Sequence, residues 1–296
     1  MADVISTDKI KLPNNLAEGI WQKAQTGSVI AALSQARPMV FGNTDIMTLD
    51  TFPKAEYVGE GKAKNPTDAT FGMKTITPKK VQVTMRFDDE VVYADEDRQI
   101  GVLQTLADQG GVALMRALDL GAIHGINPLT GEAFAGITEK LVDTTNTVTA
   151  GKDAELDLEA AVGLVISDGF VPNGFALDTA YGWKIATTRY EDGRKKFPDM
   201  SLTNAPTALL GLNTATSDTV SASKEVSTPT KLLGIAGDWS TFAWGVQRDM
   251  GVELIRYGDP DGKGDLSRFN QVALRLEMIY GWAFLDLNAF SVIKSA

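Results

Sequence analysis

The chain contains a long run of alternating hydrophobic and polar positions near its C-terminus. Every second position of this run is apolar or aromatic: Val272, Leu274, Leu276, Met278, Tyr280, Trp282 and Phe284. This period predicts a half-buried β-strand of about 13 residues, roughly 43 Å long, whereas strands usually have about 5–6 residues. Val252 and Leu254 predict its partner strand, and a Gly-rich turn over residues 259–265 separates the two.

A second alternating run leads into a long helical pattern. Residues 81–87 alternate between apolar and polar side chains, which predicts another half-buried strand. Apolar residues then recur at spacings of three and four up to Ala122. This spacing predicts a helix from about residue 97 to residue 123, on the order of 40 Å long. The adjacent glycines 110 and 111 predict a bend or a close backbone contact in its middle.

Residues 156–245 show a mixed pattern of short helices and strands. The predicted elements are helices over 156–167 and 179–187, strands over 174–177 and 232–236, and a surface loop over the Ser/Thr-rich stretch 212–230. The first helix is predicted from the spacing of Leu156, Ala160, Gly163, Leu164 and Ser167.

The first quarter of the chain holds little that could form a core. Residues 1–48 have short apolar patches at Leu16–Ala24 and Val29–Leu33, which predict an arm that is ordered only against something else. Residues 49–80 are rich in Pro, Gly and charge, with short extended stretches near Ala55–Val58 and Phe71–Ile76. They predict a long hairpin with almost no apolar face, and an isolated hairpin is marginal in water.

Composition excludes several classes of function. The chain has no cysteine and a single histidine, His124, so thiolate chemistry and zinc sites with several His or Cys ligands are excluded. The net charge of −10 argues against tight or sequence-specific nucleic-acid binding. The sequence has neither an apolar run of the roughly 18 residues that a membrane helix needs nor the order of a signal peptide. We therefore expect a protein made and kept in a cytoplasm, without catalytic residues, metal or cofactor.

Three stretches resemble a known family. In the first stretch, residues 55–62 read Ala-Glu-Tyr-Val-Gly-Glu-Gly-Lys and are followed by Phe71-Gly72 and Thr77-Pro78-Lys79-Lys80. In the second, residues 124–131 read His-Gly-Ile-Asn-Pro-Leu-Thr-Gly and are followed by Ala135-Gly136-Ile137. The third is residues 282–294. An arm, a charged hairpin, a strand, a spine helix, a mixed region and a long hairpin occur in that order. Over nearly the whole chain, this order and these stretches resemble the HK97-type major capsid protein of tailed bacteriophages.

The resemblance implies an α+β fold built from that family's parts. These are an N-terminal arm (1–48), an E-loop hairpin (49–80), a peripheral domain with the spine helix (81–150), an axial domain (151–245), the long β-hairpin of the peripheral domain (246–284) and a C-terminal strand that returns to the axial domain (285–296). Pentamers and hexamers of such a subunit tile an icosahedral shell, with the axial domains meeting at capsomer centres.

The implied function is that of a building block of the virion. The implied partners are further copies of the chain, a portal protein, a scaffolding protein and decoration proteins. Double-stranded DNA is enclosed without specific binding, assembly occurs in the host bacterial cytoplasm, and no membrane is involved. One alternative is an encapsulin, the shell protein of a cellular nanocompartment with the same fold. The others are an enzyme, which one histidine and no cysteine disfavour, and a tail or adaptor protein, which would lack the spine helix and E-loop.

Two loops are the predicted contacts between subunits. The E-loop residues are Glu60, Lys62 and Lys64, and the residues of the loop that lies near threefold contacts in the family are Asp259, Asp261, Lys263 and Asp265. Some family members join subunits covalently through a lysine and an asparagine, for which Lys62 or Lys64 and Asn270 are candidates. Exposed ion pairs of the lysines with acidic neighbours, each contributing about 0–1 kcal/mol, are favoured over such a bond.

Three other features favour a structural interpretation over a chemical one. The aspartates of the 259–265 loop lack the spacing and closing Glu of an EF-hand, so a hairpin tip is favoured over a calcium site. His124 lies between a helical stretch and a turn, which favours a satisfied structural role over catalysis. The acidic residues 88–90 are interpreted as a helix-start cluster or an intersubunit contact and not as an acid–base pair.

Overall fold

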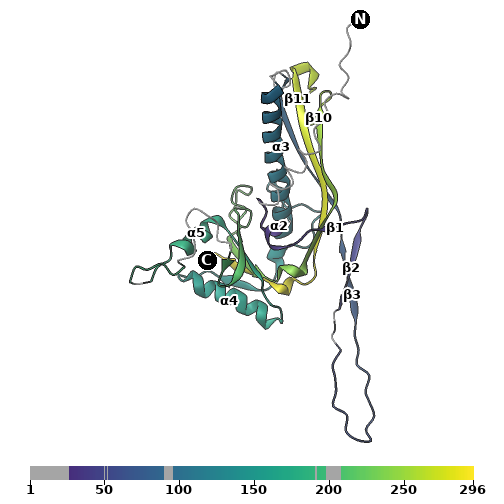
Figure 1. Ribbon diagram of the computed structural model, residues 1–296, viewed down its shortest axis with the longest axis vertical. Helices are drawn as coiled ribbons and strands as arrows, with labels where there is room; N and C mark the ends of the chain where they lie inside the picture. Colours follow the sequence, from purple (N-terminus) through teal and green to yellow (C-terminus); the bar gives the residue numbers. More distant parts are fainter. Residues whose placement is uncertain (1–26, 50, 52, 90–95, 191, 198–207) are drawn as a thin grey trace.

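The computed structural model describes residues 27–49, 51, 53–89, 96–190, 192–197 and 208–296. The molecule is elongated: a helix and long strands form an upright blade, a rounder domain lies beside its lower part, and a thin hairpin projects below (Figure 1). The described strands form a four-stranded sheet in the blade, a six-stranded sheet in the rounder domain and a two-stranded ribbon in the hairpin.

The sheet of the blade has the strand order β1-β10-β11-β4. Its strands are β1 (Arg37–Pro38), β10 (Phe242–Ile255), β11 (Gln271–Phe284) and β4 (Lys79–Asp88). The predicted long strand is confirmed as β11, a strand of 14 residues that pairs antiparallel with both β10 and β4. β10 begins ten residues earlier than the first apolar residue used to predict it, because its register continues through the pairs Phe242–Phe284 and Trp244–Trp282.

The spine helix α3 (Glu96–Asp119) packs along one face of this sheet and continues into a π-helical turn, Leu120–His124. The close contact predicted at the paired glycines is confirmed at Gly110, where the helix backbone approaches β11. A Cβ at this position would lie only 2.7 Å from Leu276 Cδ1. Gly121 plays the same part in the π-helical turn, where a Cβ would lie 2.9 Å from Trp282 Cη2. The absence of side chains at these two glycines therefore allows the helical segment and β11 to lie close together.

The rounder domain is built on the sheet β5-β12-β9-β6-β8-β7. Its strands are β5 (Thr147–Thr149), β12 (Phe290–Lys294), β9 (Leu232–Gly237), β6 (Gly174–Leu177), β8 (Leu212–Thr216) and β7 (Ala208–Leu209). The helices α4 (Ala154–Ser167) and α5 (Thr179–Thr187) share a buried apolar cluster with this sheet. Short 3-10 turns lie at Leu141–Asp143, Trp239–Thr241, Ser267–Phe269 and Leu287–Ala289.

The helix predicted over 156–167 is confirmed as α4, but the residues that predicted it do not form its buried face. Leu156 is 62% exposed, and Ala160, Gly163 and Ser167 also face outward. The buried face contains Ala154, Asp157, Leu158, Ala161 and Val165. An aspartate can lie on that face because its carboxylate accepts a hydrogen bond from the Gly151 backbone N–H at 2.9 Å.

The prediction of a surface loop over residues 212–230 is wrong for residues 212–222 and is confirmed for residues 223–230, which are irregular and largely exposed. Residues 212–216 form β8, which pairs parallel with β6. Farther along, Thr219, Val220 and Ala222 are fully buried. Serines and threonines are tolerated there because their hydroxyls donate to carboxylates of other segments: Ser221 Oγ donates to Asp178 Oδ1 at 2.6 Å, and Thr219 Oγ1 to Asp119 Oδ2 at 2.7 Å.

The N-terminal segment is docked on its own subunit from residue 28 onward. The short helix α2 (Val29–Leu33) places Val29 and Ile30 in the main core, where their exposed fractions are 1% and 0%. The predicted arm therefore does contribute to the core in this part, which corrects the expectation for residues 1–48. The apolar patch at Leu16–Ala24 lies outside the described residues.

Asp119, at the end of the spine helix, holds this segment in place. Its buried carboxylate accepts hydrogen bonds from Ser28 Oγ, Thr219 Oγ1 and the backbone N–H groups of Val29 (3.0 Å) and Ile30 (3.3 Å). Burial raises the pKa of Asp119 to about 6, although these four donors favour the charged form. One carboxylate thus joins the N-terminal segment, the spine helix and the loop after β8.

The raised pKa of Asp119 predicts a specific pH dependence of stability. The pKa of Asp119 is higher in the folded than in the unfolded chain, so the folded state binds a proton more tightly. This proton binding stabilises the folded state at low pH, and the stabilisation is lost as the pH rises from about 4 through 6. Between pH 4 and 7 we expect the free energy of unfolding of the wild type to fall relative to Asp119→Asn by on the order of 2–3 kcal/mol. Urea titrations across this range test it; a constant difference would contradict it.

Candidate assembly surfaces

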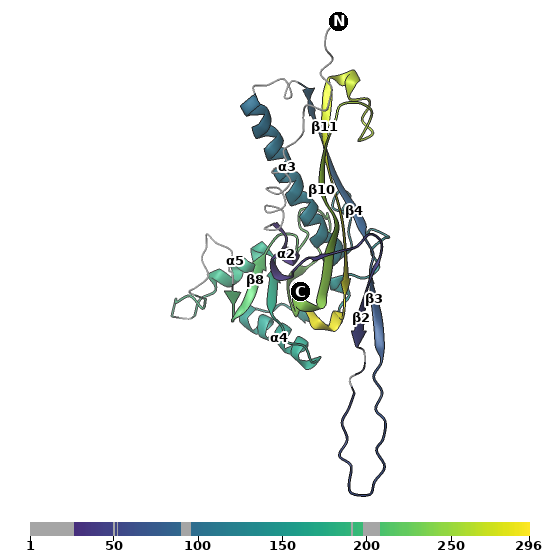
Figure 2. The same cartoon turned by 45° about the vertical axis from the view of Figure 1, so that its right-hand side comes forward.

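The hairpin that projects from the body is exposed along its whole described length. Its two paired strands are β2 (Thr44–Leu49) and β3 (Phe71–Ile76), and every described residue from 51 to 71 is exposed. Figure 2 shows the loop between them extending clear of the rest of the subunit. The predicted extended stretch at Phe71–Ile76 is confirmed. The one near Ala55–Val58 is wrong, since the partner of β3 is Thr44–Leu49.

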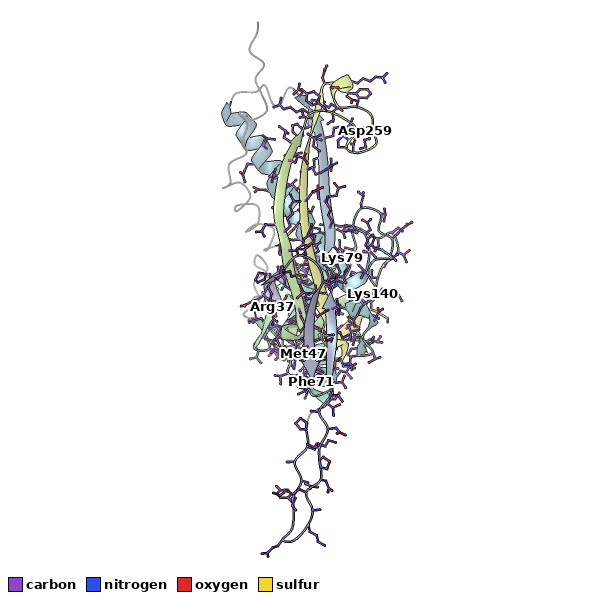
Figure 3. The ribbon with its side chains drawn as sticks, turned by 90° about the vertical axis from the view of Figure 1, so that its right-hand side faces the viewer. Arg37, Met47, Phe71, Lys79, Lys140 and Asp259 are labelled. Carbon is purple, nitrogen blue, oxygen red and sulfur yellow. The ribbon has the colours of Figure 1, made fainter. Side chains whose placement is uncertain are left out.

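The register of this ribbon gathers four large apolar side chains on one face. Leu49 is opposite Phe71 and Met47 is opposite Met73, and their exposed fractions are 38%, 67%, 70% and 70% in that order. Figure 3 shows Met47 and Phe71 on the ribbon just above the open loop. The expectation of almost no apolar face is therefore wrong at the base of the hairpin. We call Met47, Leu49, Phe71 and Met73 the ribbon face.

The predicted E-loop contacts lie at the tip of the hairpin. Glu60, Lys62 and Lys64 are all exposed there, around a turn in which the Lys62 N–H donates to the Gly59 carbonyl oxygen at 3.1 Å. The tip is also closed by a pair of hydrogen bonds that the sequence did not predict. The Glu56 carboxylate accepts from the Asn65 backbone N–H at 2.7 Å and from Asn65 Nδ2 at 2.9 Å. The tip is thus a shaped loop that presents two lysines and a glutamate.

At the opposite end of the blade, Arg86 organises the loop between the long strands. Its guanidinium forms an ion pair with Asp261, lies 3.5 Å from Asp259, and donates to the Gly264 carbonyl oxygen at 2.8 Å. Desolvation opposes ionisation of Asp261, but the hydrogen bonds from Arg86 and from the Lys263 backbone N–H, together with the charges of both residues, outweigh it and lower the pKa of that carboxyl. The role of Arg86 was not predicted, because it is 175 residues from Asp261 in the sequence.

The other predicted contact residues of this loop either form hydrogen bonds within the loop or are exposed to solvent. Asp265 accepts from the Ser267 backbone N–H at 2.9 Å, and Lys263 is exposed. Within the described ranges, no group of three Asp, Glu or His side chains converges on a possible metal position. Asn270 is exposed and directly precedes β11, in the loop between the long strands. Figure 3 shows Asp259 of this loop at the end of the molecule opposite the projecting hairpin, so a bond from Lys62 or Lys64 to Asn270 requires two subunits.

The single histidine is buried and hydrogen-bonded, which confirms the structural role predicted for it. His124 Nε2 lies 2.9 Å from the Val220 carbonyl oxygen and 3.3 Å from that of Thr219. Burial lowers the pKa of His124, so the neutral ring with its proton on Nε2 suits these two acceptors. Of the acidic residues 88–90, Asp88 is exposed and accepts from Gln271 Nε2 at 3.2 Å, and Glu90 lies outside the described residues.

Comparison with known proteins identifies the family. A profile of the phage capsid family matches residues 10–295, nearly the whole chain. The chain belongs to the phage capsid family. A solved structure from Mycobacterium phage Ogopogo is 46% identical, with a TM-score of 0.83, over 99% of this chain and 100% of that one. Another from Gordonia phage Cozz is 31% identical, with a TM-score of 0.79, over 91% and 86% of the two chains.

A curated relative carries a functional name. The probable major capsid protein gp17 of Mycobacterium phage D29 is 22% identical over 286 residues, which cover 94% of this chain and 88% of that protein. The HK97-like α+β fold predicted from the sequence is confirmed, and this phage capsid protein is a major capsid protein, a self-assembling component of the virion. The encapsulin alternative is not favoured. In the described part of the chain, no helix has the length and apolar character needed to cross a bilayer.

Removing Arg86 is expected to loosen the loop between the long strands. Arg86→Met leaves Asp261 without its cation and frees the Gly264 carbonyl, which should destabilise the loop locally. We expect faster tryptic cleavage after Lys263. The matched control is Lys80→Met on the same strand, which removes the more exposed Lys80–Glu277 ion pair (2.8 Å) and should leave cleavage unchanged. Equal cleavage of the wild type and Arg86→Met would rule out the role of Arg86.

Proposed function

We propose that this capsid protein assembles through pentamers and hexamers into a closed icosahedral shell that encloses double-stranded DNA, and that it has no catalytic activity. The observation that carries the proposal is the projecting hairpin, whose described residues 51–71 are all exposed. A subunit that worked alone would gain nothing from ordering such a segment, because fixing each residue costs about 1–2 kcal/mol of backbone entropy. Neighbouring subunits would supply the missing contacts.

The ribbon face and the hairpin tip are the surfaces that we assign to neighbouring subunits. The ribbon face would bury apolar area, which stabilises at about 25 cal/mol per Å². Glu60, Lys62 and Lys64 at the tip, and Asp259, Asp261, Lys263 and Asp265 at the other end of the blade, would add weak ionic contacts of about 0–1 kcal/mol each. Many weak contacts allow a misplaced subunit to dissociate before the shell closes. A covalent bond between Lys62 or Lys64 and Asn270 is not needed for this mechanism.

We assign residues 151–245 to an axial domain that meets its copies at capsomer centres. The net charge of −10 supports a wall that encloses DNA without gripping it. Portal, scaffolding and decoration proteins are the other proposed partners, and the proposed place of assembly is the cytoplasm of the bacterial host.

Polar substitutions on the ribbon face test the proposal. Met47→Ser with Phe71→Ser changes only exposed side chains, so the folded subunit should lose less than about 0.5 kcal/mol of stability. We expect circular dichroism and the melting temperature to remain at wild-type values while electron microscopy shows loss of closed particles.

The matched control keeps the ribbon face apolar. Met47→Leu with Phe71→Leu should still form particles. If the serine variant built shells as well as the wild type, the ribbon face would not be an assembly contact.

A further inference from the structure

A small cleft lies at the root of the hairpin, where the ribbon joins the blade. Its volume is about 250 Å³, and its walls come from three segments: the β3–β4 connection with Lys74, Thr77 and Lys79, the loop 136–139, and the end of β11 at 282–284. Figure 3 shows Lys79 and Lys140 on this part of the molecule, above Met47 and Phe71. The cleft is large enough for one or two side chains and is smaller than the roughly 300–1,000 Å³ typical of small-molecule pockets.

The cleft contains one cation more than it has anions. Its lining has two lysines and one carboxylate, and that carboxylate, Glu139, is paired with Lys74 at 3.1 Å. Outside the cleft, Lys140 lies 3.8 Å from Asp143. Lys79 has a different environment: its ammonium lies 4.4 Å from the centre of the Trp282 ring and donates to the Thr77 carbonyl oxygen at 3.3 Å. Among the described carboxylates, none forms an ion pair with Lys79. Partial burial of the ammonium lowers the pKa of Lys79.

The position of this ammonium is fixed by its surroundings. Trp282 is only 7% exposed and is packed against Gly121, so the ring that faces Lys79 cannot turn away. Ile76, three residues before Lys79, is buried against Gly281, where a Cβ would lie 2.7 Å from Ile76 Cγ2. A cation held by a rigid wall has already lost part of its conformational freedom, so an incoming anion is bound at a lower entropic cost.

We propose that, in the assembled shell, this cleft receives a carboxylate side chain from a second copy of the chain, which pairs with Lys79. The proposal rests on the proposed function, because it needs subunits that touch. Charge complementarity selects the occupant: the chain has 38 acidic and 28 basic residues, so a neighbouring copy offers an excess of carboxylates. Glu60 and Asp68 on the hairpin and Glu253 on β10 are exposed examples. Pairing would turn an unfavourable desolvated charge into a charge-assisted contact.

Zero-length cross-linking identifies the occupant directly. A carbodiimide activates a carboxylate, the lysine amine attacks it, and an amide forms as the urea leaves, so only groups already in contact are joined. In purified particles we expect mass spectrometry to find Lys79 joined to an acidic peptide of the same sequence, and in dissociated subunits to find Lys79 unmodified. The Lys80–Glu277 pair, 2.8 Å apart within one subunit, is an internal control that should react in both samples.

Substitutions test whether the contact matters for assembly. Lys79→Gln should raise the subunit concentration needed for particle formation about tenfold, the equivalent of one contact of 1.4 kcal/mol per subunit. Lys79→Arg keeps the charge over the ring and should restore assembly to near the wild-type concentration. Lys80→Gln, which changes the neighbouring exposed lysine, should shift the concentration less than twofold.

Three results would overturn the inference without touching the proposed function, two from cross-linking and one from substitution. From cross-linking, one is normal particles in which Lys79 is unlinked while Lys80–Glu277 reacts; the other is Lys79 linked only to a different protein. Particles from Lys79→Gln at the wild-type concentration would also overturn it. Failure of the wild-type chain to form any particle would instead contradict the proposed function, and the cleft contact with it.

Discussion

The structure depends on one constraint: a hairpin with no core of its own has to be ordered from outside the subunit. Every described residue from 51 to 71 is exposed, and two-stranded hairpins are marginally stable in water. The polar tip and the apolar ribbon face both lack partners in the subunit that carries them. A protein whose task is to join its copies has a use for such a segment, and its cost in entropy is offset only in the assembly.

The rigid blade makes the hairpin useful, because it fixes the position from which the hairpin projects. β4 begins at Lys79, three residues after β3 ends, and runs to Asp88, a length of roughly 33 Å. One end of this strand therefore carries the root of the hairpin with its cleft, and the other carries Arg86 and the loop that Arg86 holds. The glycines at 110 and 121 allow the spine helix and its π-helical turn to pack closely against β11. Two proposed contact surfaces are thus linked through a single paired strand.

Sequence patterns predicted the parts of the fold that repeat regularly over many residues. The alternation of residues 272–284 and the helical spacing that runs to Ala122 leave few alternatives, and both elements are confirmed. Short elements were less predictable. The buried face of α4 includes Asp157 and excludes Leu156, because a local hydrogen bond from Gly151 makes the aspartate tolerable on the sheet side. Residues 217–222 are buried by contacts with Asp119 and Asp178, which lie far away in the sequence.

The candidate surfaces were predicted in outline only. The exposed tip and the loop between the long strands follow from runs of Gly, Pro and charge. The ribbon face did not, since it depends on the register that places Met47 opposite Met73. Arg86 and Asp119 act over 175 and about 90 residues of sequence, a separation at which composition and periodicity carry no signal. Long-range polar contacts of this kind become visible only when the chain is folded.

Hydrogen exchange of residues 53–71, measured on free subunits and on assembled particles of the same protein, tests the central claim most directly. The account predicts rapid exchange of these amides in the free subunit and strong protection in the particle, while the amides of β11 are protected in both. Protection of residues 53–71 already in the free subunit, or rapid exchange that persists in intact shells, would contradict it.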